Sequence, residues 1–163
     1  MRVYGVTGWK NAGKTGLVER LVAEIAGRGL TVSTIKHAHH AVDVDQPGTD
    51  SHRHRQAGAT EVLLASGRRF ALMHELRGAP EPGLDALLQK LSPVDLVLIE
   101  GYKREPHPKI EAFRAETSHP LIARDDPSVR AVAADTGLEI DRPVFDLNDT
   151  CAIADFILQE VGL

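Results

Sequence analysis

The chain has 163 residues, a net charge of −4 and a single cysteine, Cys151. Its hydrophobic share of 42% and charged share of 26% are ordinary for a globular protein, and the length suits one domain, residues 1–163, with a sizeable core. The acidic balance disfavours a general nucleic-acid-binding role, and no apolar run reaches the length needed to cross a membrane. The lone cysteine excludes an intrachain disulfide, which fits a reducing cytoplasm.

The most informative stretch is residues 8–15, Gly-Trp-Lys-Asn-Ala-Gly-Lys-Thr, which matches the phosphate-binding pattern G-x-x-x-x-G-K-[ST] without a mismatch. Residues 3–7, before it, predict a short buried strand, and residues 17–25, after it, predict an amphipathic helix. A strand, a glycine-rich loop and a helix in this order are the context that the pattern requires. We therefore expect a nucleotide-binding loop, or P-loop, at this place.

Each residue type in this loop has a physical role. Gly8 and Gly13 let backbone N–H groups approach phosphate oxygens without a Cβ in the way, and the following helix adds its positive dipole end. Lys14 is expected to bridge the β- and γ-phosphates, and the Thr15 hydroxyl to hold Mg²⁺. Gly16 stands where many such loops carry a second hydroxyl residue. The predicted nucleotide-contacting residues of the loop are Gly8, Trp9, Lys10, Asn11, Ala12, Gly13, Lys14, Thr15 and Gly16.

The chain then continues with a β-branched segment, residues 30–36, which predicts the second strand of a right-handed βαβ unit. Turn residues and weaker patterns follow it. We expect a loop at residues 37–50 and a short helix at 51–57, capped by Asp50 or Ser51. A strand pair is expected at 60–65 with 69–76, and another short helix at 84–91.

The second strongly patterned segment is residues 94–101, whose apolar run suits a strand buried on both faces. Residues 109–114 alternate like a strand with one solvated face. Further strands are expected at residues 129–134 and 143–145, and a last helix, capped by Asn148 or Asp149, at residues 150–161. The expected fold is α/β: a P-loop NTPase-like three-layer fold with a mostly parallel central sheet plus antiparallel additions.

Polar residues at strand ends predict the rest of the site, because ligands of parallel sheets lie beyond the carboxyl ends of the strands. Lys36 and His37 end the second strand, and Glu100 and Gly101 end the buried one. Asp95 starts that same strand, about 16 Å from Glu100 at ~3.3 Å per residue. Glu100, together with Thr15, is therefore the predicted Mg²⁺ contact, with a turn-capping role for Glu100 as the alternative.

The histidines and charged residues between the second strand and the strand pair have less specific interpretations. A transition-metal site is disfavoured because no cysteine accompanies the histidines and their spacing is not a recognised zinc arrangement; phosphate contact or ordinary surface positions remain. For the acidic residues of this segment there are two interpretations: one of them is a second Mg²⁺ contact, or all of them belong to a solvated loop. The residues concerned are His37, His39, His40, His52 and His54, with Asp43, Asp45 and Asp50. No guanine-reading Asn-Lys-x-Asp stretch is present, so the motifs do not define the base.

Five blocks in this order resemble the family of molybdopterin-guanine dinucleotide biosynthesis adapter proteins, MobB. They are the loop 8–15, Lys-His-Ala-His-His at 36–40, the segment 50–59, Asp-Leu-Val-Leu-Ile-Glu-Gly-Tyr-Lys at 95–103, and Pro-Lys-Ile-Glu at 108–111. The resemblance extends over essentially the whole chain, and the second and fourth blocks are its more specific parts.

The resemblance implies a cytoplasmic, homodimeric protein that binds GTP with Mg²⁺. Such a protein assists the guanylyltransferase that joins GMP to molybdopterin, by binding GTP, molybdopterin or its guanine dinucleotide, and it carries no catalytic residue of its own. Besides the loop, Lys36, His37, Asp50 and Gly101 would contact the nucleotide. Neither nucleic acid nor a membrane is an expected partner.

Two other functions fit part of the pattern. A small-molecule kinase, or a ligase of the dethiobiotin-synthetase type, would share the P-loop and the strand-end Glu100-Gly101 pair. A regulatory GTPase switch is disfavoured by the missing guanine motif. Hydrolysis is expected to be slow at most, because no glutamine or arginine is identifiable from the sequence as a water-positioning residue or arginine finger.

Overall fold

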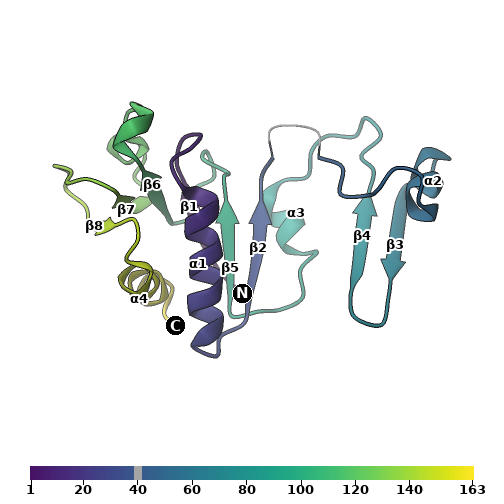
Figure 1. Ribbon diagram of the computed structural model, residues 1–163, viewed down its shortest axis with the longest axis horizontal. Helices are drawn as coiled ribbons and strands as arrows, with labels where there is room; N and C mark the ends of the chain where they lie inside the picture. Colours follow the sequence, from purple (N-terminus) through teal and green to yellow (C-terminus); the bar gives the residue numbers. More distant parts are fainter. Residues whose placement is uncertain (39–41) are drawn as a thin grey trace. The chain divides into compact units, whose positions relative to one another are not determined.

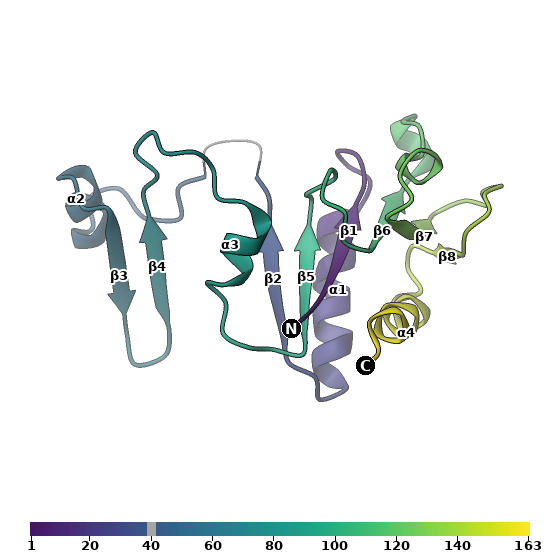
Figure 2. The same cartoon turned by 180° about the vertical axis from the view of Figure 1, so that it is seen from behind.

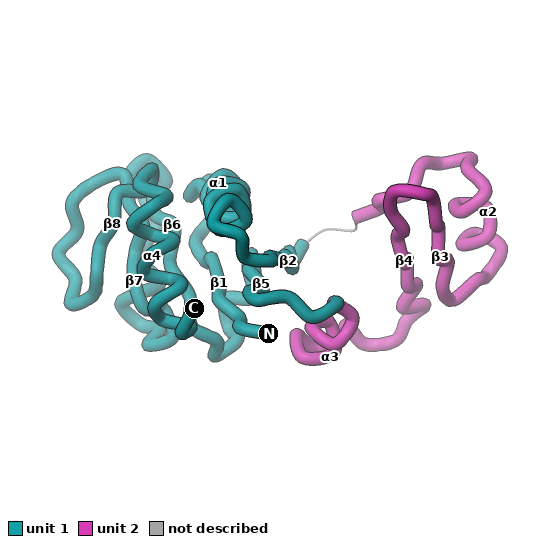
Figure 3. The backbone as a smooth tube through the Cα atoms, turned by 90° about the horizontal axis from the view of Figure 1, so that it is seen from below, with its two compact units in different colours: residues 1–38, 92–163 teal, residues 39–91 magenta. Residues whose placement is uncertain are grey.

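The structure is a computed structural model that describes residues 1–38 and 42–163. The chain packs as two compact units, residues 1–38 with 92–163 and residues 39–91, which Figure 3 colours teal and magenta. The single domain expected from the sequence stays a prediction.

The first unit is built on a six-stranded sheet in which every pair of neighbours is parallel. Its strand order is β2-β5-β1-β6-β7-β8, so β1 and β5 lie in the interior of the sheet (Figure 1). The strands are β1 (Arg2–Thr7), β2 (Val32–Lys36), β5 (Leu96–Glu100), β6 (Lys109–Phe113), β7 (Val129–Ala134) and β8 (Val144–Asp146). This sheet confirms the α/β fold with a mostly parallel centre.

Two helices, α1 (Lys14–Gly27) and α4 (Thr150–Val161), cover one face of this sheet. Figure 1 shows α1 in front of the strands, and Figure 2, seen from behind, shows it beyond them. The helix buries Leu17, Leu21 and Ile25, one turn apart, because apolar residues at this spacing share a face. A smaller cluster joins β7 to the short helix η2 (Ile122–Arg124), and another such helix, η1 (Ala115–Thr117), precedes it.

Strand β6 departs from the prediction of one solvated face. Lys109 and Glu111 are both 0% exposed, since β6 lies between β1 and β7. The Lys109 ammonium donates to the carbonyl oxygens of Lys103 and Glu105 at 3.2 and 2.5 Å and to Ser128 Oγ at 2.8 Å. The alternation of charged and apolar residues therefore marks buried, fully partnered polar groups, and the predicted wet face is wrong.

The second unit contains α2 (Asp50–Gln56), the antiparallel pair β3 (Glu61–Ala65) and β4 (Phe70–His74), and α3 (Leu84–Leu88). The antiparallel addition is thus confirmed. The cap of α2 is Thr49, whose side chain accepts a hydrogen bond from the His52 amide, and not Asp50 or Ser51. Propensity ranks Asp and Ser above Thr as caps, but Ser51 instead donates its hydroxyl to Asp45 at 2.9 Å.

Other boundaries shift by a few residues. Helix α3 ends at Leu88, three residues before the expected end, whereas α4 has the predicted bounds and Asp149 as its cap. Cys151, at the start of α4, is exposed. None of the helices in the described part of the chain is long and apolar enough to cross a membrane.

Candidate functional site: the P-loop and its strand-end neighbours

The P-loop connects β1 to α1 at the carboxyl end of an interior strand (Figure 1). Its two glycines have positive φ angles, 141° at Gly8 and 92° at Gly13. A Cβ at Gly8 would lie 2.4 Å from the Ala112 carbonyl oxygen of β6, so only glycine fits between the loop and the neighbouring strand. The loop can therefore hold its amide groups toward a ligand because both glycines are present.

Lys14 and Thr15 begin α1 next to this loop. The Lys14 ammonium donates a hydrogen bond to the Trp9 carbonyl oxygen at 2.6 Å, across the loop. Burial, and after it the positive charge of Lys103, lowers the pKa of Lys14 below its ordinary value. Two lysine side chains close together in a half-buried position favour a polyanionic ligand such as a nucleoside triphosphate.

Glu100 is the acidic residue at this edge of the sheet. It is 8% exposed, and its Oε1 accepts the Thr15 hydroxyl at 2.9 Å and lies 3.3 Å from the Lys36 ammonium. Asp95, five residues before Glu100, instead accepts hydrogen bonds from the amide and the hydroxyl of Thr31 at 2.8 and 2.7 Å. The structure thus brings together Thr15 and Glu100, as the sequence prediction requires, and leaves Asp95 elsewhere.

A carboxylate and a hydroxyl beside a P-loop fit Mg²⁺, which prefers oxygen ligands and usually takes few from the protein and the rest from phosphates and water. Thr15 and Glu100 would hold the ion, and the ion would neutralise phosphate charge. Among the described residues no group of three or more His, Cys, Asp or Glu side chains could hold a metal ion.

The segment after Glu100 turns sharply beside the loop. Gly101 and Tyr102 both have positive φ, and the Tyr102 ring lies 4.6 Å from the ring of His37. The Lys103 ammonium lies 3.9 Å from the centre of the Trp9 ring. Lys36, His37 and Gly101, all predicted site residues, therefore meet at one edge of the sheet with the loop.

Trp9 makes contacts that the sequence did not predict. Its ring stacks on His119 with centroids 5.0 Å apart, and its indole N–H donates to the Pro120 carbonyl oxygen at 2.7 Å. A hollow of about 450 Å³ lies at the same side, lined by Lys10, Asn11, Glu116, Thr117 and His119. No motif marks residues 114–120, so only the path of the chain after β6 reveals them.

Several predicted residues lie elsewhere. Asp50, His52 and His54 belong to the second unit, where they line a hollow of about 710 Å³ with Arg53. The Asp50 carboxylate lies 3.8 Å from the Arg53 guanidinium and is exposed. His39 and His40 lie outside the described residues. The nucleotide contact predicted for Asp50 stays a prediction.

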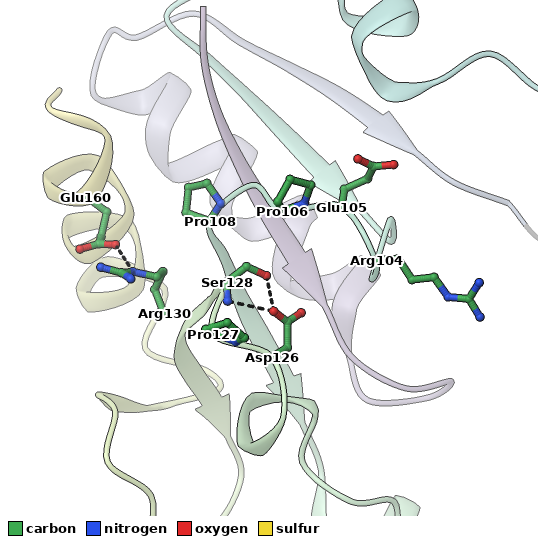
Figure 4. A pocket seen from close by; sticks show the side chains of 9 residues that line it. All are labelled: Arg104, Glu105, Pro106, Pro108, Asp126, Pro127, Ser128, Arg130 and Glu160. Atoms are coloured by element: carbon green, nitrogen blue, oxygen red, sulfur yellow. Dashed lines mark hydrogen bonds and ion pairs between the residues drawn. The ribbon is translucent and has the colours of Figure 1, made fainter.

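Another hollow, of about 640 Å³, lies in the first unit and is shown in Figure 4. Its lining residues come mainly from the segments that precede β6 and β7, so it lies toward the amino ends of these strands. Within it Ser128 bonds Asp126, and Arg130 pairs with Glu160 at 3.2 Å (Figure 4). The P-loop lies at the opposite, carboxyl ends, which is where parallel sheets bind their ligands.

A parallel sheet with a glycine-rich loop between an interior strand and a helix defines the P-loop NTPase-like class of folds. Residues 3–135 match the family described as MobB, molybdopterin guanine dinucleotide synthesis protein B. The chain therefore belongs to the MobB family.

Relatives over nearly the whole chain agree with this assignment. The molybdopterin-guanine dinucleotide biosynthesis adapter protein of Haemophilus influenzae is 46% identical over 158 residues, which cover 95% of this chain and 86% of that protein. Its Escherichia coli counterpart is 40% identical over 154 residues, with 93% and 88% covered. The crystal structure of a MobB homolog from Bacillus stearothermophilus matches with a TM-score of 0.74 at 32% identity and covers 99% of both chains.

Proposed function

We propose that this protein binds GTP with Mg²⁺ at the P-loop and acts in the cytoplasm as an adapter in molybdopterin guanine dinucleotide synthesis. The observation that carries the proposal is the hydrogen bond from Thr15 to Glu100, beside Lys14, because these three side chains are the metal and phosphate contacts that a P-loop needs. The names of the relatives support the pathway.

The partner in this role is the guanylyltransferase that joins GMP to molybdopterin. The adapter would present GTP, molybdopterin or its guanine dinucleotide to that enzyme and would hydrolyse GTP slowly at most. A small-molecule kinase or a dethiobiotin-synthetase-like ligase is the competing function. Rapid phosphoryl transfer from GTP or ATP to a small acceptor, in single-turnover assays, would favour the competitor over the adapter.

Replacement of Lys14 tests the nucleotide site. We expect Lys14→Ala to weaken Mg-GTP binding at least 100-fold in titration calorimetry, because a half-buried ammonium that meets two phosphates would supply several charge-assisted hydrogen bonds. Lys90→Ala removes an exposed lysine of the second unit and is the matched control. Circular dichroism must show that both variants fold. Equal affinities of the two variants for Mg-GTP would contradict the proposed site.

The second unit carries an apolar face that we assign to the contact between two copies of the chain. Leu63 lies directly opposite Leu72, and Phe70 is opposite Ala65, so these side chains share one face of the β3-β4 pair. Leu63, Phe70 and Leu72 are 62%, 72% and 48% exposed. A lone two-stranded pair is marginally stable in water, and the same face on a second copy would cover it around a two-fold axis.

A further inference from the structure

An arginine next to the P-loop has no role in the site as described so far. Arg114 directly follows β6, at the carboxyl edge of the sheet. Strand β6 pairs with β1, with Glu111 opposite Thr7, and Thr7 is the residue before the loop. The parallel pairing therefore brings Arg114 to the same edge as the P-loop, on the side of β1 that faces away from β5.

The guanidinium of Arg114 lies against the last glycine of the loop. A Cβ built at Gly13 would be 3.2 Å from Arg114 Nε and 3.6 Å from Arg114 Nη2. A Cβ at Gly13 would displace the guanidinium slightly, and the φ of 92° at this residue independently favours glycine. Lys14 directly follows Gly13 in the chain. The Arg114 guanidinium therefore lies against the residue next to the lysine that is expected to hold the phosphates.

The hydrogen-bonding groups of Arg114 are poorly used within the protein. Arg114 Nε is buried and has no hydrogen-bond partner among the described residues. Arg114 Nη1 lies 3.5 Å from Glu116, whose side chain is 71% exposed, and such a long, solvated ion pair contributes little. A guanidinium has five N–H donors, and buried donors are normally satisfied. Nε is the unsatisfied buried donor, whereas the side chain as a whole is 42% exposed, so its terminal nitrogens are open to a ligand at the loop.

We propose that Arg114 is a further phosphate-binding residue of the nucleotide site, and this rests on the proposed function. Its terminal guanidinium nitrogens donate to phosphate oxygens of the nucleotide held by the loop, in the forked geometry that suits phosphate. The strand order places Glu100 and Lys36 on the β5 side of β1 and Arg114 on the β6 side. The phosphates are then contacted from both sides of the loop.

The test compares Arg114→Gln with Arg124→Gln, which removes an exposed arginine from the same connection between β6 and β7. Affinities for GTP, GDP and GMP with Mg²⁺ are measured by calorimetry, and thermal unfolding is recorded for each protein. We expect Arg114→Gln to bind GTP 10- to 100-fold more weakly with little change in Tm, and Arg124→Gln to bind like the parent. Normal GTP binding by a folded Arg114→Gln protein overturns the proposal.

A second variant covers the case in which Arg114→Gln does not fold. Arg114→Lys keeps the charge and the aliphatic stem but loses the fork, so we expect a Tm near the parent value and GTP affinity lowered several-fold. Parent-like affinity of Arg114→Lys would then overturn the proposal. Failure of the unmodified protein to bind any nucleotide contradicts the proposed function itself. Parent and Arg114→Gln proteins that bind alike, while Lys14→Ala does not bind, contradict only the role of Arg114.

Discussion

Single residues at the ends of strands define the chemistry of the candidate site. Glu100 ends β5, accepts the Thr15 hydroxyl at 2.9 Å and is nearly buried, whereas Asp95 precedes the same strand and bonds Thr31. The two carboxylates belong to one segment and have different hydrogen-bond partners because a strand separates its two ends by several residues of extended chain. The hydrogen bonds from Thr31 hold the pKa of Asp95 below its ordinary value, as is usual for a structural carboxylate.

The two acids can be separated by experiment. Glu100→Gln should reduce the Mg²⁺-dependent gain in GTP affinity about tenfold or more, because an amide oxygen is a weaker Mg²⁺ contact than a carboxylate. Asp95→Asn should leave GTP affinity unchanged and lower the thermal stability, since its contacts tie the start of β5 to Thr31. The measurement is GTP titration with and without Mg²⁺. A larger loss of Mg²⁺ dependence in Asp95→Asn would overturn the choice of Glu100.

At the scale of elements, β6 is distinguished by two fully buried charged side chains, Lys109 and Glu111. Glu111 accepts the amides of Ile122 and Ala123 at 3.0 and 2.8 Å, and burial raises its pKa in spite of these bonds. Lys109 binds the carbonyl oxygens of Lys103 and Glu105, and Lys103 contacts Trp9 of the P-loop. Through Lys109, β6 holds the segment that precedes it, and through Glu111 it holds the short helix η2 that follows it.

Removal of the buried lysine should therefore be costly. We expect Lys109→Met to reduce the free energy of unfolding by about 2–4 kcal/mol, because it removes a fully buried ammonium and leaves two partly buried carbonyl groups and Asp126 without their cationic partner. Arg130→Met, which removes an arginine 54% exposed and paired with Glu160, is the control and should have little effect. Urea denaturation gives both values. Equal stability of the two variants would mean that the Lys109 contacts contribute nothing.

At the scale of the whole molecule, the chain forms two compact units with different architectures. The parallel sheet carries the P-loop, and the second unit carries the β3-β4 pair with its apolar face. Parallel sheets need crossover helices, and α1 and α4 bury the face that they cover. In the described part of the chain, Leu63, Phe70 and Leu72 on one face of the separate two-stranded pair are exposed.

Charges placed on that face should separate the copies. We expect the parent protein to sediment as a dimer at micromolar concentration and the double variant Phe70→Lys with Leu72→Lys to sediment as a monomer, because buried unpaired charges oppose association. Leu64→Lys alters a residue 53% exposed on the opposite face of β3 and should leave the dimer intact. A parent protein that is monomeric, or a double variant that remains dimeric, would contradict the assignment.

The sequence by itself determined the glycine-rich loop pattern, the α/β class, the bounds of β7 and α4, and the position of Glu100 at the loop end of its strand. These features follow from local rules: a fixed spacing of glycines, hydrophobic periodicity and the length of a strand. The prediction failed where local patterns are degenerate. Thr, Asp and Ser are all favoured helix caps, so a run of the three does not define which one caps the helix. Alternating charged residues occur in a solvated strand as well as in a buried strand such as β6.

Only the tertiary structure decided which distant groups meet. In the folded chain Lys109 binds carbonyl oxygens, His119 stacks on Trp9, and Arg114 lies close to Gly13. Strand order produces these contacts, because it selects which strand ends become neighbours, and it depends on packing between segments far apart in the chain. The motif therefore predicts where phosphate would bind, and the strand next to β1 decides which further side chains reach that place.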